Sequence, residues 1–408
     1  MVSVDSPRRQ QPSRESERRA TPLETFYDLV FAVALTAIGT GLNSDPTWSG
    51  ALRSLALFIP IWWAWLGHTV YNTRFDNDDV VERLCTLFIM LAAAAMAVQV
   101  PHTFVGASTG FAAAYVGARV GLLLLYAQVW HRARETRAIV GLYLGGFGVG
   151  AACWAVSIAV PPPTRYILWA AGLGIDLALP WVGRPILKQA PVDTAHLPER
   201  LALFTIIVLG SIITLLVAGV LQPAAGVAAY VAAAVSFGYV VCIWWAYFTF
   251  IDTAPFAERL GSGQPYMYLH LPILAGLLLV GVGLEQSITA AAHVMLSGPS
   301  RWMLGGGTVL WLTAALGLHR ASLGSLQPVA YVRFGGAALI VALLTGLGGA
   351  LPPLVLLGGI VLSVLIFTVF DVSYWTAWRH EHAPAGGDDD QAEQYAGQSG
   401  VPDKQARG

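Results

Sequence analysis

Apolar stretches of about 20 residues recur along the whole chain, and no other feature of the sequence limits the fold as strongly. A helix of about 20 apolar residues crosses the hydrocarbon core of a bilayer. Only helices and closed barrels satisfy every backbone hydrogen bond in lipid. The stretches at 201–221 and 354–370 lack the polar and apolar alternation of barrel strands, so we expect an all-α integral membrane protein.

The composition agrees with lipid as the surrounding medium. Hydrophobic residues make up 56% of the chain and charged residues only 12%, whereas soluble domains carry charge on about 25% of their residues. The formal net charge of -1 offers no general attraction to nucleic acid, so no nucleic-acid partner is expected. Cys85, Cys153 and Cys242 lie inside apolar runs and are expected to be packing residues.

Polar breaks divide the apolar stretches into about twelve expected transmembrane helices. Several of these are short or rich in glycine, so counts of ten and eleven stay open. The expected ranges are 23–42, 50–71, 83–100, 109–130, 138–159, 165–183, 201–221, 225–251, 267–291, 301–319, 332–350 and 354–378.

Lys and Arg concentrate in the amino-terminal tail and in every second loop after it. The opposite loops offer only Arg53, Arg165 and Arg301, at their edges. Cytoplasmic loops of membrane proteins are enriched in Lys and Arg. We therefore expect a multi-pass protein of the cell membrane with both termini in the cytoplasm.

The two halves of the chain resemble each other. Trp-Trp-Ala-Trp at 62–65 recurs as Trp-Trp-Ala-Tyr at 244–247, and prolines precede both the sixth and the twelfth expected helix. Six helices per half give both halves the same orientation, which predicts two parallel six-helix repeats; chance similarity between apolar helices is the alternative. The predicted divisions are a disordered tail (1–20), the first repeat (21–183), a cytoplasmic linker (184–200), the second repeat (201–380) and a disordered acidic tail (381–408).

The first expected helix begins with a capping sequence and then carries a second acid. Thr21 is placed to cap the helix, and Glu24 to complete a capping box. Asp28 lies one turn further on the same face and has no such role. A carboxylate at that depth faces the bundle interior, pairs with a cation or lines an ion path. The alternative is that Asp28 extends back to the cytoplasmic interface.

Two opposite charges lie at matching depths in the fourth and sixth expected helices. Arg119 and Asp176 are each about ten residues from the outer ends of their helices, or about 15 Å at 1.5 Å per residue. An arginine at the bilayer centre costs at least about 2.5 kcal/mol, so a partner is expected. The pair can line a solute path, and a purely structural ion pair is the equally good alternative.

Three further polar residues are candidates for an ion path. His68 and His270 lie near the inner ends of their helices at about the depth of Asp28, where histidines can relay protons. Glu285 lies toward the outer end of the ninth expected helix. For each, an ordinary interhelical hydrogen bond is the competing interpretation.

Residues 21–31, Thr-Pro-Leu-Glu-Thr-Phe-Tyr-Asp-Leu-Val-Phe, resemble the opening of the bacterial low temperature requirement A family. Further similarities lie at 62–63, 73–76, 199–210, 244–248 and 270–285. The resemblance implies a multi-spanning membrane protein that is associated with growth in the cold and has no well-defined biochemical activity. Ser211 stands where family members commonly have Glu, so any role of that acid is absent or replaced here.

The sequence therefore predicts a transporter or ion-conducting protein of unknown solute. A membrane scaffold or cold-adaptation factor without transport is the alternative. Nucleotide-binding, metalloprotease and nucleophile-elbow motifs are absent from the sequence, so no enzyme activity, cofactor or metal site is expected. The expected partners are the lipid bilayer and an unidentified small solute or ion, and the oligomeric state stays open.

Overall fold

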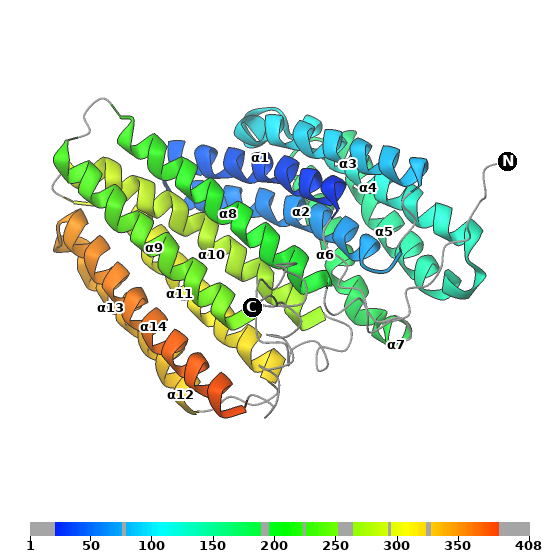
Figure 1. Cartoon of the computed structure of the whole chain (residues 1–408). Coiled ribbons are helices and arrows are strands. Elements are labelled where there is room, and N and C mark those ends of the chain that lie inside the picture. The colour runs from blue at the N-terminus through cyan, green and yellow to red at the C-terminus, as the bar shows by residue number, and fades with distance from the viewer. Residues whose placement is uncertain are drawn as a thin grey trace, which may run out of the picture.

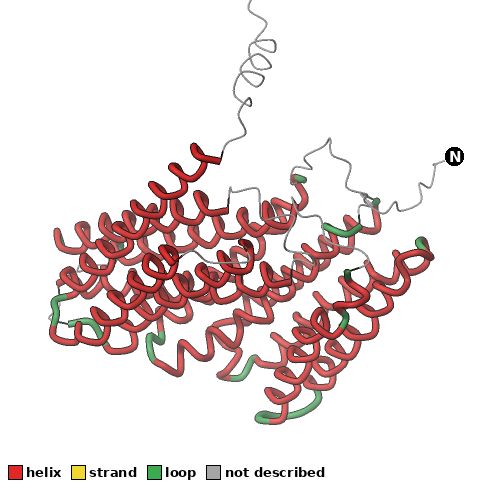
Figure 2. Tube along the Cα trace, turned by 90° about the horizontal axis from the view of Figure 1, so that it is seen from below, coloured by secondary structure: helices red, strands yellow, loops and turns green. Residues whose placement is uncertain are grey.

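The computed structural model describes residues 21–75, 79–188, 196–222, 226–251, 264–292, 295–323 and 328–382. Every element in these ranges is a helix (Figure 2). The predicted disordered tails, 1–20 and 381–408, lie outside the described residues apart from the last two residues of the final helix.

Six long helices make up the first half of the described chain, joined by short 3-10 segments, Val100–Val105 and Arg134–Thr136. Their bounds are α1 (Pro22–Ser44), α2 (Trp48–Asn72), α3 (Val80–Gln99), α4 (Ser108–Arg132), α5 (Arg137–Ile158) and α6 (Thr164–Val182).

The second half follows the single helical turn α7 (Arg184–Leu187). Its helices are α8 (His196–Val220), α9 (Val227–Ile251), α10 (Gln264–Thr289), α11 (Gly298–Leu323), α13 (Gly336–Leu347) and α14 (Pro353–His382), with the short α12 (Pro328–Ala330) and the π-helical segment Tyr331–Gly335 before α13, and 3-10 turns at Ala290–Ala292 and Gly348–Ala350.

Ten helices of the described chain are long and apolar enough to cross a membrane. Each of the twelve expected ranges coincides with a long helix, but α6 and α11 are not among these ten. Arg165 and Asp176 make α6 less apolar, whereas Arg301 and Arg320 lie near the two ends of α11 and leave an uncharged stretch at 302–319.

The helix expected at 201–221 begins earlier than predicted, because α8 begins at His196. Pro198 falls in the first turn of α8, where the missing backbone N–H costs no hydrogen bond. The early start places His196 and Arg200 one helical turn apart on the same helix face.

Four helices, α1, α2, α8 and α10, form the centre of the bundle (Figure 1). On one side α3 to α6 pack in succession, and on the other side α9, α11, α13 and α14 pack together. The central helices α1 and α8, the first of each half, lie against each other. We refer below to the Pro22 end of the bundle, where α1 and α8 begin, and to the Ser44 end, where α1 ends.

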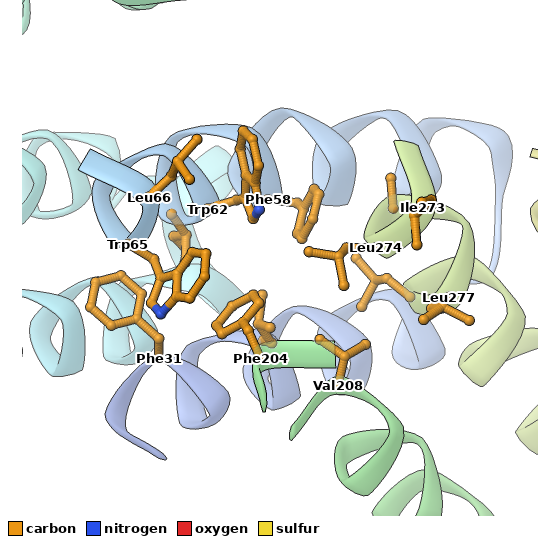
Figure 3. Close-up of a cluster of buried hydrophobic side chains, with 14 of the residues drawn as sticks. Phe31, Phe58, Trp62, Trp65, Leu66, Phe204, Val208, Ile273, Leu274 and Leu277 are labelled. Carbon is orange, nitrogen blue, oxygen red and sulfur yellow. The ribbon is translucent and has the colours of Figure 1, made fainter. Parts of the chain in front are cut away.

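The centre of this bundle is filled by aromatic and aliphatic side chains (Figure 3). Trp65 of α2 stacks on Phe204 of α8 with ring centroids 4.0 Å apart, and Phe31 of α1 lies next to them. Val208 and Leu274 continue the cluster along α8 and α10. This apolar block separates the two ends of the α1 and α8 interface.

Candidate functional site

Two acid–base contacts cross from α1 to α8 at the Pro22 end. Glu24 Oε1 lies 3.3 Å from His196 Nε2, and Asp28 Oδ1 accepts a hydrogen bond of 2.8 Å from Arg200 Nη2. All four residues are buried, with at most 3% of each exposed. The contacts therefore join the two halves of the chain through charges removed from solvent.

The spacing of the residues explains why the two contacts form together. Glu24 and Asp28 are four apart on α1, and His196 and Arg200 are four apart on α8. Residues four apart lie on one face of a helix, one turn from each other. Two helices that begin side by side and run together can therefore match both pairs at once.

Asp28 has a second partner on a third helix. Trp65 Nε1 of α2 donates a hydrogen bond of 2.8 Å to the same Oδ1 atom. The interpretation that Asp28 extends back to the interface is wrong, because the carboxylate is 1% exposed and is held by α2 and α8. Asp28 therefore lies where three of the four central helices meet.

The predicted cap at the start of α1 is confirmed. The backbone N–H of Glu24 donates to Thr21 Oγ1 at 3.2 Å, and the backbone N–H of Thr21 donates to Glu24 Oε2 at 2.8 Å. Glu24 uses one carboxylate oxygen for the cap and the other for His196. The same residue thus begins the helix and joins the halves.

Midway along the interface two hydroxyl groups meet. Thr36 Oγ1 of α1 donates to Ser211 Oγ of α8 at 3.2 Å. They line a small cavity among α1, α2, α8 and α10 whose other walls are apolar, including Leu35, Phe58 and Leu274. Ser211, at the position where the family pattern has an acid, therefore faces α1 and a cavity in the centre of the bundle.

A third polar contact lies at the Ser44 end, between α1 and α10. Asn43 Nδ2 donates to Glu285 Oε1 of α10 at 2.7 Å, and Gln286 Nε2 donates to Asn43 Oδ1 at 2.6 Å. Glu285 is 2% exposed, while Asn43 and Gln286 are half-buried. Glu24, Asp28, Thr36 and Asn43 together are the polar line of α1.

The pairing of Arg119 with Asp176 is present as expected from their depths. Arg119 Nη2 lies 2.7 Å from Asp176 Oδ2, and the Tyr115 hydroxyl donates to the same oxygen at 3.3 Å. The guanidinium also lies 4.3 Å from the centre of the Phe147 ring. All of these residues belong to α4, α5 and α6, so this pair lies within the first half and away from the polar line of α1.

The two predicted histidines lie in separate surroundings. His68 Nε2 is 3.0 Å from Thr86 Oγ1, and its ring stacks on Tyr27 at 4.4 Å. His270 Nε2 is 2.9 Å from the Tyr247 hydroxyl. In the described part of the chain neither ring forms a hydrogen bond or ion pair with Asp28. The interhelical hydrogen bonds match the competing interpretation.

Sequence reasoning overlooked three residues of this site, His196, Arg200 and Trp65. The signal for His196 and Arg200 is the repeated spacing of four between the acids at the start of α1 and the bases at the start of α8. Within the described ranges no group of three His, Cys, Asp or Glu side chains is arranged to hold a metal ion.

The helices and the buried charges between them define a multi-span helical membrane protein. The family model of the bacterial low temperature requirement A protein (LtrA) matches residues 19–369, and the chain belongs to this family. An uncharacterized protein of Rhizobium meliloti (strain 1021) is 26% identical over 325 residues, which cover 75% of this chain and 78% of the relative. The family match at 19–369 contains both the α1 and the α8 residues of the site.

Proposed function

We propose that this protein is a transporter or ion-conducting protein whose path follows the polar line of α1 between α8 and α10. The observation that carries the proposal is the pair of buried acid–base contacts between α1 and α8. Ionisable residues inside a membrane are expensive and are concentrated on ion and substrate pathways. In repeat-built transporters such sites lie where the repeats meet.

The polar line has the length that a membrane path requires. Glu24 and Asn43 are nineteen residues apart, about 28 Å at 1.5 Å per residue, and the hydrocarbon core is about 30 Å thick. The side chains of Thr36 and Ser211 lie between the two ends. The apolar block around Phe31 and Phe204 interrupts the line, which fits a closed path.

The same proposal includes the topology. We infer that α6 and α11 also cross the bilayer, that both termini are cytoplasmic and that the halves are parallel repeats. The packing order supports this arrangement: α1 contacts α2 and α3 as α8 contacts α9 and α10, and α3 packs on α4 as α10 packs on α11. The Pro22 end is then the cytoplasmic end, in agreement with the arginine distribution.

Flux through proteoliposomes tests the proposal. Purified protein is reconstituted, and movement of H⁺, Na⁺, K⁺ and Cl⁻ is followed with ion-sensitive dyes under imposed gradients. Asp28→Asn is expected to abolish the flux that the wild type supports, because it removes the charge that Arg200 contacts. Asp79→Asn is the matched control, since Asp79 lies before α3 and outside the polar line.

Absence of flux for all four ions from correctly folded wild-type protein would argue against the proposal. The second candidate is a membrane scaffold, and it is favoured by the Arg119–Asp176 pair, whose side chains are at most 1% exposed and which lies against the Phe147 ring. A scaffold predicts that Asp28→Asn changes stability alone. Measuring melting temperature and flux on the same preparations separates the two functions.

A further inference from the structure

Glu285 differs from Glu24, Asp28 and Asp176 in having no basic side chain beside it within the described part of the chain. Glu24 contacts His196, Asp28 contacts Arg200, and Asp176 contacts Arg119. Glu285 accepts one hydrogen bond, from Asn43, and its Oε2 atom has no hydrogen-bond partner within the described chain. It is nevertheless 2% exposed.

The neighbouring helices do not supply the missing charge. At the Ser44 end the ionisable groups of helices packed on α10 are Asp45 after α1, Arg53 on α2, Arg301 on α11 and the exposed Tyr230 on α9. Asp45 and Arg53 lie 3.7 Å apart and pair with each other. The described ends of α8 and α14 contain no ionisable side chain, and Arg301 forms no ion pair with Glu285 in the described chain.

Close packing keeps solvent from the stem of the side chain. A Cβ atom at Gly219 of α8 would lie 3.3 Å from Glu285 Cγ and 3.2 Å from Ile288, so glycine allows α8 to close over the acid. An ionised carboxylate without a cation costs far more in such surroundings than a neutral acid with one unmet hydrogen bond. The neutral form also suits the contact with Asn43, whose N–H₂ group donates to the carbonyl oxygen Oε1.

We propose that Glu285 is a proton-binding site that holds its carboxyl group in the neutral form at neutral pH. The proton comes from water at the Ser44 end and binds Oε2, and no other group changes its bonding. Half-buried Asn43 and Gln286 connect the acid with that end of the bundle. If the proposed function holds, on which this extension rests, H⁺ is the transported or coupled ion and Glu285 is the site that releases or receives it.

Infrared spectroscopy of the full-length protein in lipid nanodiscs tests the proton directly. The wild type at pH 7 is expected to show the carbonyl stretch of a protonated carboxylic acid, and Glu285→Gln is expected to lose that band. Glu24→Gln is the matched control and should retain it. Absence of the band from the difference spectrum of folded Glu285→Gln would overturn the proposal.

A second variant guards against failure of Glu285→Gln to fold. Asn43→Leu leaves the acid in place but removes the amide that donates to its carbonyl oxygen. The band should persist and move to higher frequency, because a carbonyl group that loses a hydrogen bond stiffens. An unmoved band would show that the acid observed is not Glu285.

Two further outcomes identify the ion. At fixed pH, adding Na⁺ or K⁺ should change the melting temperatures of the wild type and of Glu285→Gln by the same amount. If the added cation stabilises the wild type but not the variant, the site binds a metal cation, and the proposal of a bound proton is overturned. A protonated Glu285 in a protein that conducts no ion would leave this inference standing and the proposed path wrong. Ion flux without an infrared band from Glu285 would leave the proposed path standing and show that this inference is wrong.

Discussion

The described part of the structure contains two buried pairs of arginine and aspartate, and their surroundings differ. Arg119 and Asp176 both belong to the first half and are enclosed by aromatic rings and by the backbone of Gly150. Arg200 and Asp28 come from different halves and continue into other polar groups, with Trp65 on one side and a second acid–base contact one turn away.

The comparison shows that a buried ion pair does not by itself indicate a solute path. Both pairs have the same chemistry, nearly the same N–O distance and almost no exposure. Only the pair between the halves lies on a line of polar residues that runs along one helix. The following predictions test whether the first pair is structural and the second functional, from the largest expected effect to the smallest.

The largest effect is expected from separating Arg119 and Asp176. Arg119→Ala leaves a buried carboxylate without its cation and is expected to cost about 3–5 kcal/mol of stability. Arg119→Ala combined with Asp176→Ala should cost less than the sum of the single changes, because no charge is stranded. The free energies of unfolding of the wild type, both single variants and the double variant, measured in lipid or detergent micelles, give the coupling between the two residues. Additive effects would show that the two residues do not depend on each other.

Asp28→Asn tests the pair between the halves. The variant keeps the shape of the side chain and an oxygen for Trp65, so the expected loss of stability is about 1–3 kcal/mol. Its effect on flux should be much larger than its effect on stability. For Asp176→Asn, in contrast, we expect any loss of flux to be proportional to the loss of folded protein. A variant of Asp28 with normal flux would remove the functional difference between the pairs.

Gly150→Ala tests the packing around Asp176 without changing a charge. The added Cβ atom would overlap Asp176 Oδ1 and must displace it or α5. We expect a loss of about 1–3 kcal/mol, as for overpacked cores. Gly145→Ala on the same helix is the control, because its Cβ meets nothing within 4 Å. Equal melting temperatures for the two variants would show that α5 does not restrain the pair.

The smallest effect is expected from an exposed ion pair, Asp79 with Arg132, which also involves Gln128. Burial acts to raise the pKa of Asp79, but the backbone N–H of Glu82 and the Arg132 guanidinium outweigh it and the pKa is lowered. Asp79→Asn should cost about 0.2–1 kcal/mol. The stability that Asp79→Asn loses should be fully present above the unfolded pKa of about 3.9 and should disappear as the pH falls from there through the lower folded pKa. A stability difference between the variant and the wild type that increases at acidic pH would contradict the lowered pKa of Asp79.

Local chemistry allowed several features to be predicted from the sequence. The cap formed by Thr21 and Glu24 depends only on residues three apart, and both of its hydrogen bonds are present. The pairing of Arg119 with Asp176 followed from depth, because the rise per residue of a helix is constant. The starting point of α8 was predicted five residues late, because a polar sequence with a proline is equally typical of a loop.

The sequence by itself determined the class of protein and the positions of its long helices, because lipid requires apolar helices of a set length. Only the tertiary structure decided which partners the polar residues meet. Arg200 lies 172 residues from Asp28. Helices that are apolar on all sides carry no mark of which face meets which neighbour, so the rotation of α8 against α1, and with it the site, came from packing.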